Sequence, residues 1–166
     1  MLGARAVELV TARVVHSNPG WLAKLLKSYD NKDVLAVGYP ASETGGIAYP
    51  DGTPVVLVAA VNNYGSQSMG IPPRPFMQEG AKAALDGDAG KVAAELVPLL
   101  NQGKITVKEI LRQMGPYAEA SFKGVFTGVA WAPNADYTIE KKGSAQPLIG
   151  ETGLLRATLT HVVRSR

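Results

Sequence analysis

The residues that could carry out chemistry in this chain are few and widely separated. There are 2 histidines among the 166 residues, His16 and His161, and no cysteine. A metal site in a protein needs three or four convergent ligands, and neither histidine has further histidines or carboxylates at a spacing that would complete a set. We therefore expect both histidines to be structural residues in or beside strands, and we predict no metal site.

The closest approach to a catalytic or phosphate-binding motif is the segment GSQSMG, residues 65–70. It does not match the G-x-S-x-G nucleophile elbow, and no general base lies near it in sequence. P-loop and dinucleotide-binding fingerprints are missing as well. The carboxylates are dispersed, so no acid–base pair stands out. The sequence therefore predicts no catalytic residue and no cofactor. We expect a protein that is not an enzyme, and a small hydrolase is the weakest alternative.

Composition indicates one globular domain spanning residues 1–166. Apolar residues make up 46% of the chain and charged residues 19%, which is typical of a folded protein rather than a disordered one. No stretch approaches the 18 or more apolar residues of a membrane span, so we expect no membrane association. The lack of cysteine fits assembly in a reducing cytoplasm.

Strands are expected in three places. Residues 6–15 are rich in β-branched residues, and residues 34–40, VLAVGYP, read as a strand buried on both faces because polar alternation is missing. The tail from residue 152 to residue 164 alternates polar and apolar side chains and predicts a C-terminal strand. A short helix should follow Asn18-Pro19, where a capping residue precedes proline.

Helices are expected to dominate the middle of the chain. One should begin at Pro75, with glycines after residue 86 able to break it and Pro98 kinking or ending it. The sequence T-V-K-E at residues 106–109 is a capping box that opens an amphipathic helix extending to about residue 128. Gly115-Pro116 should interrupt that helix, and Leu111 should lie in the core. The expected fold class is α+β: a small mixed or antiparallel sheet packed against one long amphipathic helix, or a broken helix pair, with long loops.

Two segments between the strand at residue 34 and the helix at residue 75 are harder to assign. Residues 40–54 have turn chemistry throughout, and a long loop in a compact domain is usually functional. Residues 54–64 favour a helix because a proline precedes them and Gly65 follows, although their valines suit a strand. We expect residues 40–54 to be mobile in an isolated subunit and to be ordered by a neighbouring subunit or tail protein.

Three sequence pieces, in order, resemble a known family. They are VNNYG with IPPRPFM at residues 61–77, WAPN with YTI and KKG at residues 131–143, and PLI with ETGLLR at residues 147–156. Together they resemble the tail-completion and virion-morphogenesis proteins of tailed bacteriophages and Mu-like prophages. Two positions depart from the family pattern: the family has an acidic residue where this chain has Asn63, and an aspartate where this chain has Glu151.

The resemblance implies a structural α/β protein of the virion. Such proteins form a ring, commonly a hexamer, at the head–tail neck or at the head-proximal end of the tail. The ring caps the tail tube and joins the tail to the connector. Its expected partners are therefore further copies of itself and other tail-tube and neck proteins, assembled in the cytoplasm of the bacterial host. The sequence does not distinguish a tail terminator from a stopper or another neck component.

The proline-rich loop suggests where such a ring would make contact. Pro72, Pro73 and Pro75 each fix φ and restrict the preceding residue. The loop is therefore ordered before it meets a partner, which lowers the entropy cost of association by about 1 kcal/mol for each residue that would otherwise have to be fixed. Arg74 should then point its guanidinium at a partner. The expected interface residues are Arg74, Pro73, Pro75 and Ile71, with Ile47 and Tyr49 from the preceding loop. The alternative is that this loop contacts no partner and only forms a rigid corner within its own subunit.

A second hypothesis is contact with the DNA that passes through a neck ring, as a minor tail or DNA-contacting neck protein. The net charge is +3, and the last third of the chain has an excess of lysine and arginine. A DNA-binding footprint normally requires this charge to cluster on one face. Steep salt dependence of duplex binding would distinguish this hypothesis from the first.

Overall fold

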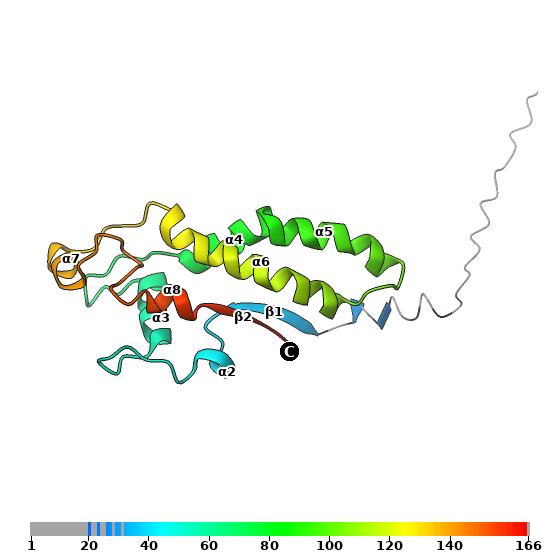
Figure 1. Ribbon diagram of the computed structural model, residues 1–166, viewed down its shortest axis with the longest axis horizontal. Helices are drawn as coiled ribbons and strands as arrows, with labels where there is room; N and C mark the ends of the chain where they lie inside the picture. The colour runs from blue at the N-terminus through cyan, green and yellow to red at the C-terminus, as the bar shows by residue number, and fades with distance from the viewer. Residues whose placement is uncertain (1–19, 21–22, 24–25, 28, 31, 166) are drawn as a thin grey trace, which may run out of the picture.

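The computed structural model describes residues 20, 23, 26, 27, 29, 30 and 32–165 (Figure 1). The strand predicted over residues 6–15 lies outside the described residues. Of the helix predicted after Asn18-Pro19, residues 23, 26, 27 and 29 are described, and these four are helical. In chain order the elements are β1 (Asp33–Gly38), α2 (Ala41–Thr44), α3 (Val55–Tyr64), α4 (Phe76–Asp86), α5 (Asp88–Asn101), α6 (Val107–Gly128), α7 (Asp136–Lys142), α8 (Leu154–Thr158) and β2 (Thr160–Ser165).

The two strands form an antiparallel sheet that joins distant parts of the chain. Val34 lies opposite Arg164, and Gly38 lies opposite Thr160. The long helix α6 packs along this sheet, and α4 and α5 pack against α6 (Figure 1). Helices α3, α7 and α8 gather at the other end of the molecule. The α+β class is therefore confirmed, with an antiparallel sheet and a single long helix.

Helix α6 begins as predicted but is not interrupted where the sequence suggested. The Thr106 backbone N–H donates to Glu109 Oε2 at 2.7 Å, and the Glu109 backbone N–H donates to Thr106 Oγ1 at 3.3 Å, which completes the capping box. The predicted break at Gly115-Pro116 is wrong, since 22 residues form one helix. Gly115 is needed for a different reason: a Cβ there would collide with the His161 ring on β2. The glycine allows the sheet to approach the helix closely.

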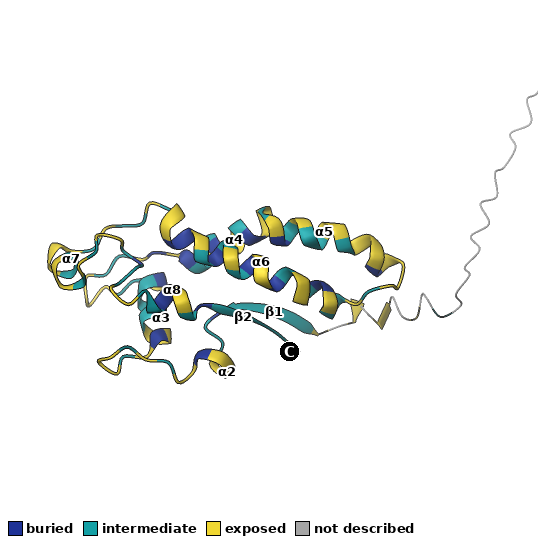
Figure 2. Ribbon diagram, viewed as in Figure 1, coloured by how far each residue is buried: buried dark blue, intermediate teal, exposed yellow. Residues whose placement is uncertain are grey.

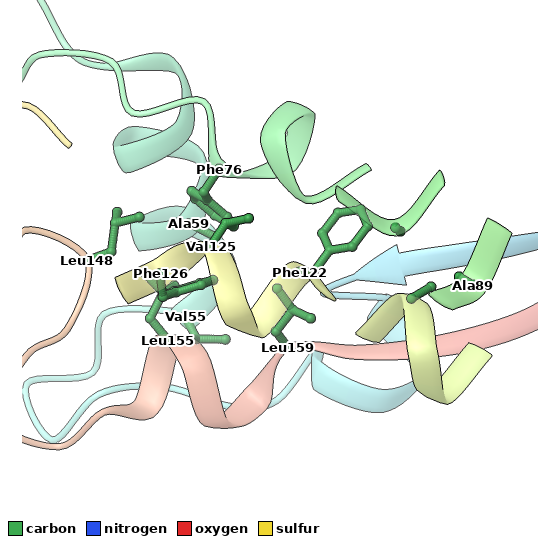
Figure 3. Close-up of a cluster of buried hydrophobic side chains, with 12 residues drawn as sticks. Val55, Ala59, Phe76, Ala89, Phe122, Val125, Phe126, Leu148, Leu155 and Leu159 are labelled. Carbon is green, nitrogen blue, oxygen red and sulfur yellow. The ribbon is translucent and has the colours of Figure 1, made fainter. Parts of the chain in front are cut away.

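The hydrophobic core lies where α3, α4, α6 and α8 meet. Phe76, Phe126, Leu159 and Val55 are the largest fully buried side chains, and Figure 3 shows them within one cluster. The rings of Phe76 and Phe126 are 5.1 Å apart and tilted by 56°, a favourable aromatic geometry. The stripe through Phe122 and Phe126 is confirmed as core. Leu111 is only half-buried, because the neighbouring Ile110 takes the inward position.

Strand β1 is less buried than its sequence suggested. Residues 33–37 are half-buried, and only Gly38 is buried, as the colouring of both strands in Figure 2 also shows. A continuous apolar run predicts a strand covered on both faces, but this sheet has two strands, and α6 is the helix that contacts both of them. The prediction of burial on both faces is therefore wrong for the described structure.

The ambiguous segment before Gly65 is a helix, α3, as favoured. Gly65 follows it with φ of 75°, a conformation that glycine adopts without strain. A break separates α4 from α5 at Gly87, whereas Pro98 stays inside α5. Residues 40–54 contain more structure than the expected loop, namely α2 and a bridge between Ala48 and Pro54. The tail is also more structured than predicted, because α8 precedes the strand.

Candidate functional site

The proline-rich loop connects α3 to α4 through a tight, hydrogen-bonded turn. Ser66 and Ile71 exchange backbone hydrogen bonds of 2.8 and 2.9 Å, which closes the turn. The backbone of Arg74 then returns to α3, donating from its N–H to the Asn62 carbonyl at 2.8 Å. A Cβ on Gly65 would lie 2.8 Å from Ile71 O, so the loop folds back closely onto the end of α3. The sequence prediction of a rigid loop agrees with this geometry.

The side chain of Arg74 is buried and makes four hydrogen bonds within its own subunit. It is 2% exposed. Its Nε donates to the Ala132 carbonyl at 2.8 Å, and its Nη2 donates to the Pro133 carbonyl at 3.0 Å. The remaining bonds go to the side-chain oxygens of Asn62 at 3.1 Å and Asn134 at 3.0 Å. The planar fork of an arginine suits such a set of convergent oxygens.

This geometry corrects the prediction that Arg74 points at a partner. The guanidinium is aimed at backbone carbonyls, as its chemistry suggested, but those carbonyls belong to residues 132 and 133 of the same chain. The segment after α6 exposes carbonyls that no helix or sheet satisfies, and a buried arginine satisfies them. Arg74 therefore joins the proline-rich loop to the segment after α6 and does not present its charge to the surface.

The other predicted interface residues lie in different surroundings. Pro73 and Pro75 are exposed beside the buried arginine, while Ile71 is half-buried. Ile47 and Tyr49 are also half-buried and pack against the hydrophobic core. The structure contains no partner chain, so the role of these residues in an interface stays a prediction.

Asn63, which the sequence marked only as a departure from the family pattern, is a structural residue. It is 3% exposed, and its Oδ1 accepts a hydrogen bond from the Met77 backbone N–H at 3.0 Å. This amide is one of the free N–H groups in the first turn of α4, so Asn63 caps α4 from a distance. An asparagine at the end of an apolar helix was the available signal, but its target 14 residues later was not predictable.

A cavity of about 670 Å³ lies next to Arg74, at the end of the molecule where α3, α7 and α8 gather. It is lined by all three sequence pieces that carry the resemblance: Ile71 and Arg74 from the first, Asn134 and Lys142 from the second, and Leu148 and Glu151 from the third. Tyr49 lines it as well. The cavity therefore brings together some of the predicted site residues, Arg74, Ile71 and Tyr49, but not Ile47, Pro73 or Pro75.

Charged side chains of both signs line this cavity: Arg74, Lys141 and Lys142 are cationic, and Asp51 and Glu151 are anionic. Lys142 is half-buried and donates to the Pro147 carbonyl at 3.2 Å. Burial and the nearby positive charge of Arg74 lower the pKa of Lys142. Burial also lowers the pKa of Arg74, which nevertheless stays protonated at neutral pH. Two of these cations, Arg74 and Lys142, thus have neutral oxygens as their hydrogen-bond partners.

The histidine of β2 pairs with a carboxylate of α6. His161 Nδ1 lies 2.6 Å from Glu119 Oε2 on α6, and Lys123 Nζ lies 2.6 Å from Glu119 Oε1. Burial alone would raise the pKa of Glu119, but the hydrogen bonds from Lys123 and His161 outweigh it and hold that pKa below its ordinary value. The third partner of this carboxylate is Thr160 Oγ1 at 3.3 Å. The cluster connects α6 to the sheet.

Comparison with known proteins adds no relative. No protein-family model, curated protein or solved structure matches this chain. Within residues 32–165 and the few described positions before them, no group of three or more His, Asp or Glu side chains could hold a metal ion. The helices that the structure describes include none that is both long and apolar enough to cross a membrane.

Proposed function

We propose that this chain is a structural subunit of a tailed-phage virion. In this role it forms a ring, a hexamer in the arrangement that the resemblance implies, at the neck or at the head-proximal end of the tail. The ring joins the tail to the connector, and the subunit catalyses no reaction. It is assembled in the host cytoplasm and remains in the virion.

One observation carries the proposal: the three sequence pieces of the resemblance come together in space. Residues 62 and 74 meet residues 132–134 through the Arg74 hydrogen bonds. Lys142 meets Pro147 at the same end. Motifs separated by 58 to 60 residues thus build one local structure around a cavity. If that end of the subunit makes the assembly contacts, members of the family should share its local structure. They should then also share the sequence pieces that build it.

The architecture suits a ring subunit because its two ends differ. One end is a packed helical layer over a sheet, formed by α4, α5 and α6, and the other holds the short helices α3, α7 and α8 with the hydrogen-bonded loops that connect them (Figure 1). A heterologous contact between two different surfaces of a subunit repeats head to tail and closes into a ring when the rotation allows. Rigid loops lower the ordering cost of each such contact.

Disruption of the gene in the phage or prophage that carries it tests this function. The expected result is a loss of infectious particles, with electron micrographs showing filled heads and tails that are unjoined or of abnormal length. Wild-type protein supplied from a plasmid should restore the titre. Normal, infectious particles in the absence of the protein would overturn the proposal.

A further inference from the structure

The sheet leaves one edge of each strand without a strand partner among the described residues. Strands β1 and β2 pair only with each other there, and two strands alone make a marginally stable sheet. The two edges differ in sequence. Strand β2 carries Thr160, His161 and Arg164, whereas residues 34–38 of β1, VLAVG, hold no charged or polar side chain. Proteins commonly protect a free edge strand with charge or proline. Strand β1 therefore has the sequence of an inner strand although it lies at an edge.

The packing of β1 leads to the same conclusion. Leu35 and Val37 pack against the hydrophobic core, and α6 and β2 are the elements that β1 packs against. Because successive side chains of a strand point to opposite faces, Val34 and Ala36 lie on the face away from α6. All four side chains are only half-buried (Figure 2). A further strand on the free edge of β1 would pair with its backbone and cover the flanks of these side chains.

The chain contains a sequence suited to that edge. Residues 6–15, AVELVTARVV, predict a strand, since five of the ten are valine or threonine. They lie outside the described residues. Ten residues are enough to pair with all six residues of β1. The segment and the edge are thus matched in length and in their apolar, β-branched character.

The described residues that precede β1 favour an acceptor edge in another subunit. Residues 23, 26, 27 and 29 are helical, and this segment lies beyond the start of β1 rather than over the sheet (Figure 1). Tyr29 Oη donates to Asn101 Oδ1 at 2.9 Å and holds its end there. Leu26 is 62% and Tyr29 59% exposed. A strand–helix–strand unit within one subunit would instead pack the apolar side of such a helix on its own sheet.

We propose that the free edge of β1 receives residues 6–15 of a second copy of this chain as a third strand. The backbone N–H and C=O groups of the two strands pair, as in other cases of strand addition, and β1 becomes the central strand. This contact rests on the ring proposed above and specifies it. It joins the N-terminal segment of one copy to the sheet of the next and is therefore head-to-tail.

Engineered disulfides test the contact in the full-length protein, because the chain has no cysteine of its own. One chain carries Ala36→Cys, and a second, tagged chain carries a single cysteine at each position from 6 to 15 in turn. After mixing and oxidation, disulfides between the two chains should form at alternate positions of the scan, because every second residue of a strand faces the same side. Tyr137→Cys on α7, where the side chain is 73% exposed, replaces Ala36→Cys as the control and should show no alternation.

A double variant distinguishes a neighbouring subunit from the same chain. It combines Ala36→Cys with the cysteine that crosslinks best in the scan. If residues 6–15 come from the next copy, oxidation should give a ladder of covalently linked chains in a denaturing gel. A monomer closed by an internal disulfide would show that the segment pairs with its own sheet, and would overturn the proposal.

Proline substitutions test the backbone pairing without a disulfide. Val10→Pro and Thr11→Pro each remove one N–H from the middle of the segment, and alanine at the same positions keeps it. Successive N–H groups of a strand point to opposite sides, so one of the two prolines should be tolerated. The other should weaken association at least about tenfold in sedimentation velocity, while both alanine variants stay close to wild type. Circular dichroism melting shows whether each subunit remains folded.

The outcomes separate this contact from the ring. If the wild-type protein forms rings but the scan shows no alternation and both proline variants associate normally, the contact is wrong and the ring stands. If the wild-type protein stays monomeric at the highest concentration, the contact between copies is overturned, and the gene disruption decides separately on the role in the virion. Alternating crosslinks together with the ladder support the proposal.

Discussion

Two regions of this molecule are held together by different interactions: the helical layer, formed by α4, α5 and α6 over the sheet, and the loop end, formed by α3, α7, α8 and the loops that connect them. In the layer, α4, α5 and α6 bury apolar side chains such as Phe122 and Phe126 against one another and against the sheet. At the loop end, the centre is a charged side chain, Arg74, surrounded by oxygens from residues 62 and 132–134. Apolar burial is non-directional and follows from periodicity, whereas an arginine with four hydrogen bonds depends on atomic geometry.

The difference predicts which changes each region tolerates. Close-packed apolar side chains accept a replacement of similar volume at modest cost. A buried, hydrogen-bonded arginine accepts none, because lysine has the charge without the planar fork. Substitutions in the two regions should therefore differ in how far a conservative replacement rescues stability.

The largest expected effect is in the helical layer. Phe126→Ala removes a fully buried ring that packs on Phe76, and should lower the free energy of unfolding by about 3–5 kcal/mol. Phe126→Leu should recover most of that loss. Urea denaturation of both variants measures this, with exposed Leu85→Ala as the control. A change of less than about 1 kcal/mol for Phe126→Ala would show that this cluster is not the core.

The next effect is at the loop end. Arg74→Ala leaves the carbonyls of Ala132 and Pro133 without their donors and should cost about 2–4 kcal/mol. Arg74→Lys should cost nearly as much, since one ammonium cannot serve four separated acceptors. Near-complete recovery of stability in the lysine variant would mean that charge alone, rather than the fork, holds the loop end together.

A smaller effect is expected where the two regions meet. Asn63→Ala removes the acceptor for the Met77 N–H at the start of α4 and should cost about 1–2 kcal/mol, as the loss of a helix cap does. Asn63→Asp keeps an acceptor oxygen and should cost less. Equal losses in both variants, measured by thermal unfolding, would indicate that the capping bond contributes nothing.

The smallest effect concerns the carboxylate between α6 and the sheet. The pKa of Glu119 is held below its ordinary value of 4.5, so its contribution to stability is present above that value and is lost as pH falls through the folded-state pKa. Glu119→Gln should therefore lower the free energy of unfolding by about 1 kcal/mol at neutral pH. The difference from wild type should shrink in acid. A difference that is constant between pH 7 and the acid limit would contradict this linkage.

The sequence allowed the helical layer to be predicted and left most of the loop end out of reach. The capping box at Thr106 and the stripe through Phe122 are local, periodic signals, and the structure confirms both. The effect of Gly115 was misread because its constraint comes from His161, a residue of a distant strand. The partners of Arg74 lie 12 and 58–60 residues away, and no local pattern records contacts of that kind. The cavity is likewise assembled from three separate segments.

Hydrogen exchange of the Arg74→Lys variant beside the wild-type protein tests most directly whether the loop end depends on this one side chain. We predict faster exchange confined to residues 62–75 and 129–155, with the amides of α4 and α6 keeping their wild-type protection. Local opening of this kind reports the stability of one region separately from that of the whole fold. Unchanged exchange at the loop end, or an equal increase in every element, would contradict the division of the molecule into a packed layer and an arginine-centred end.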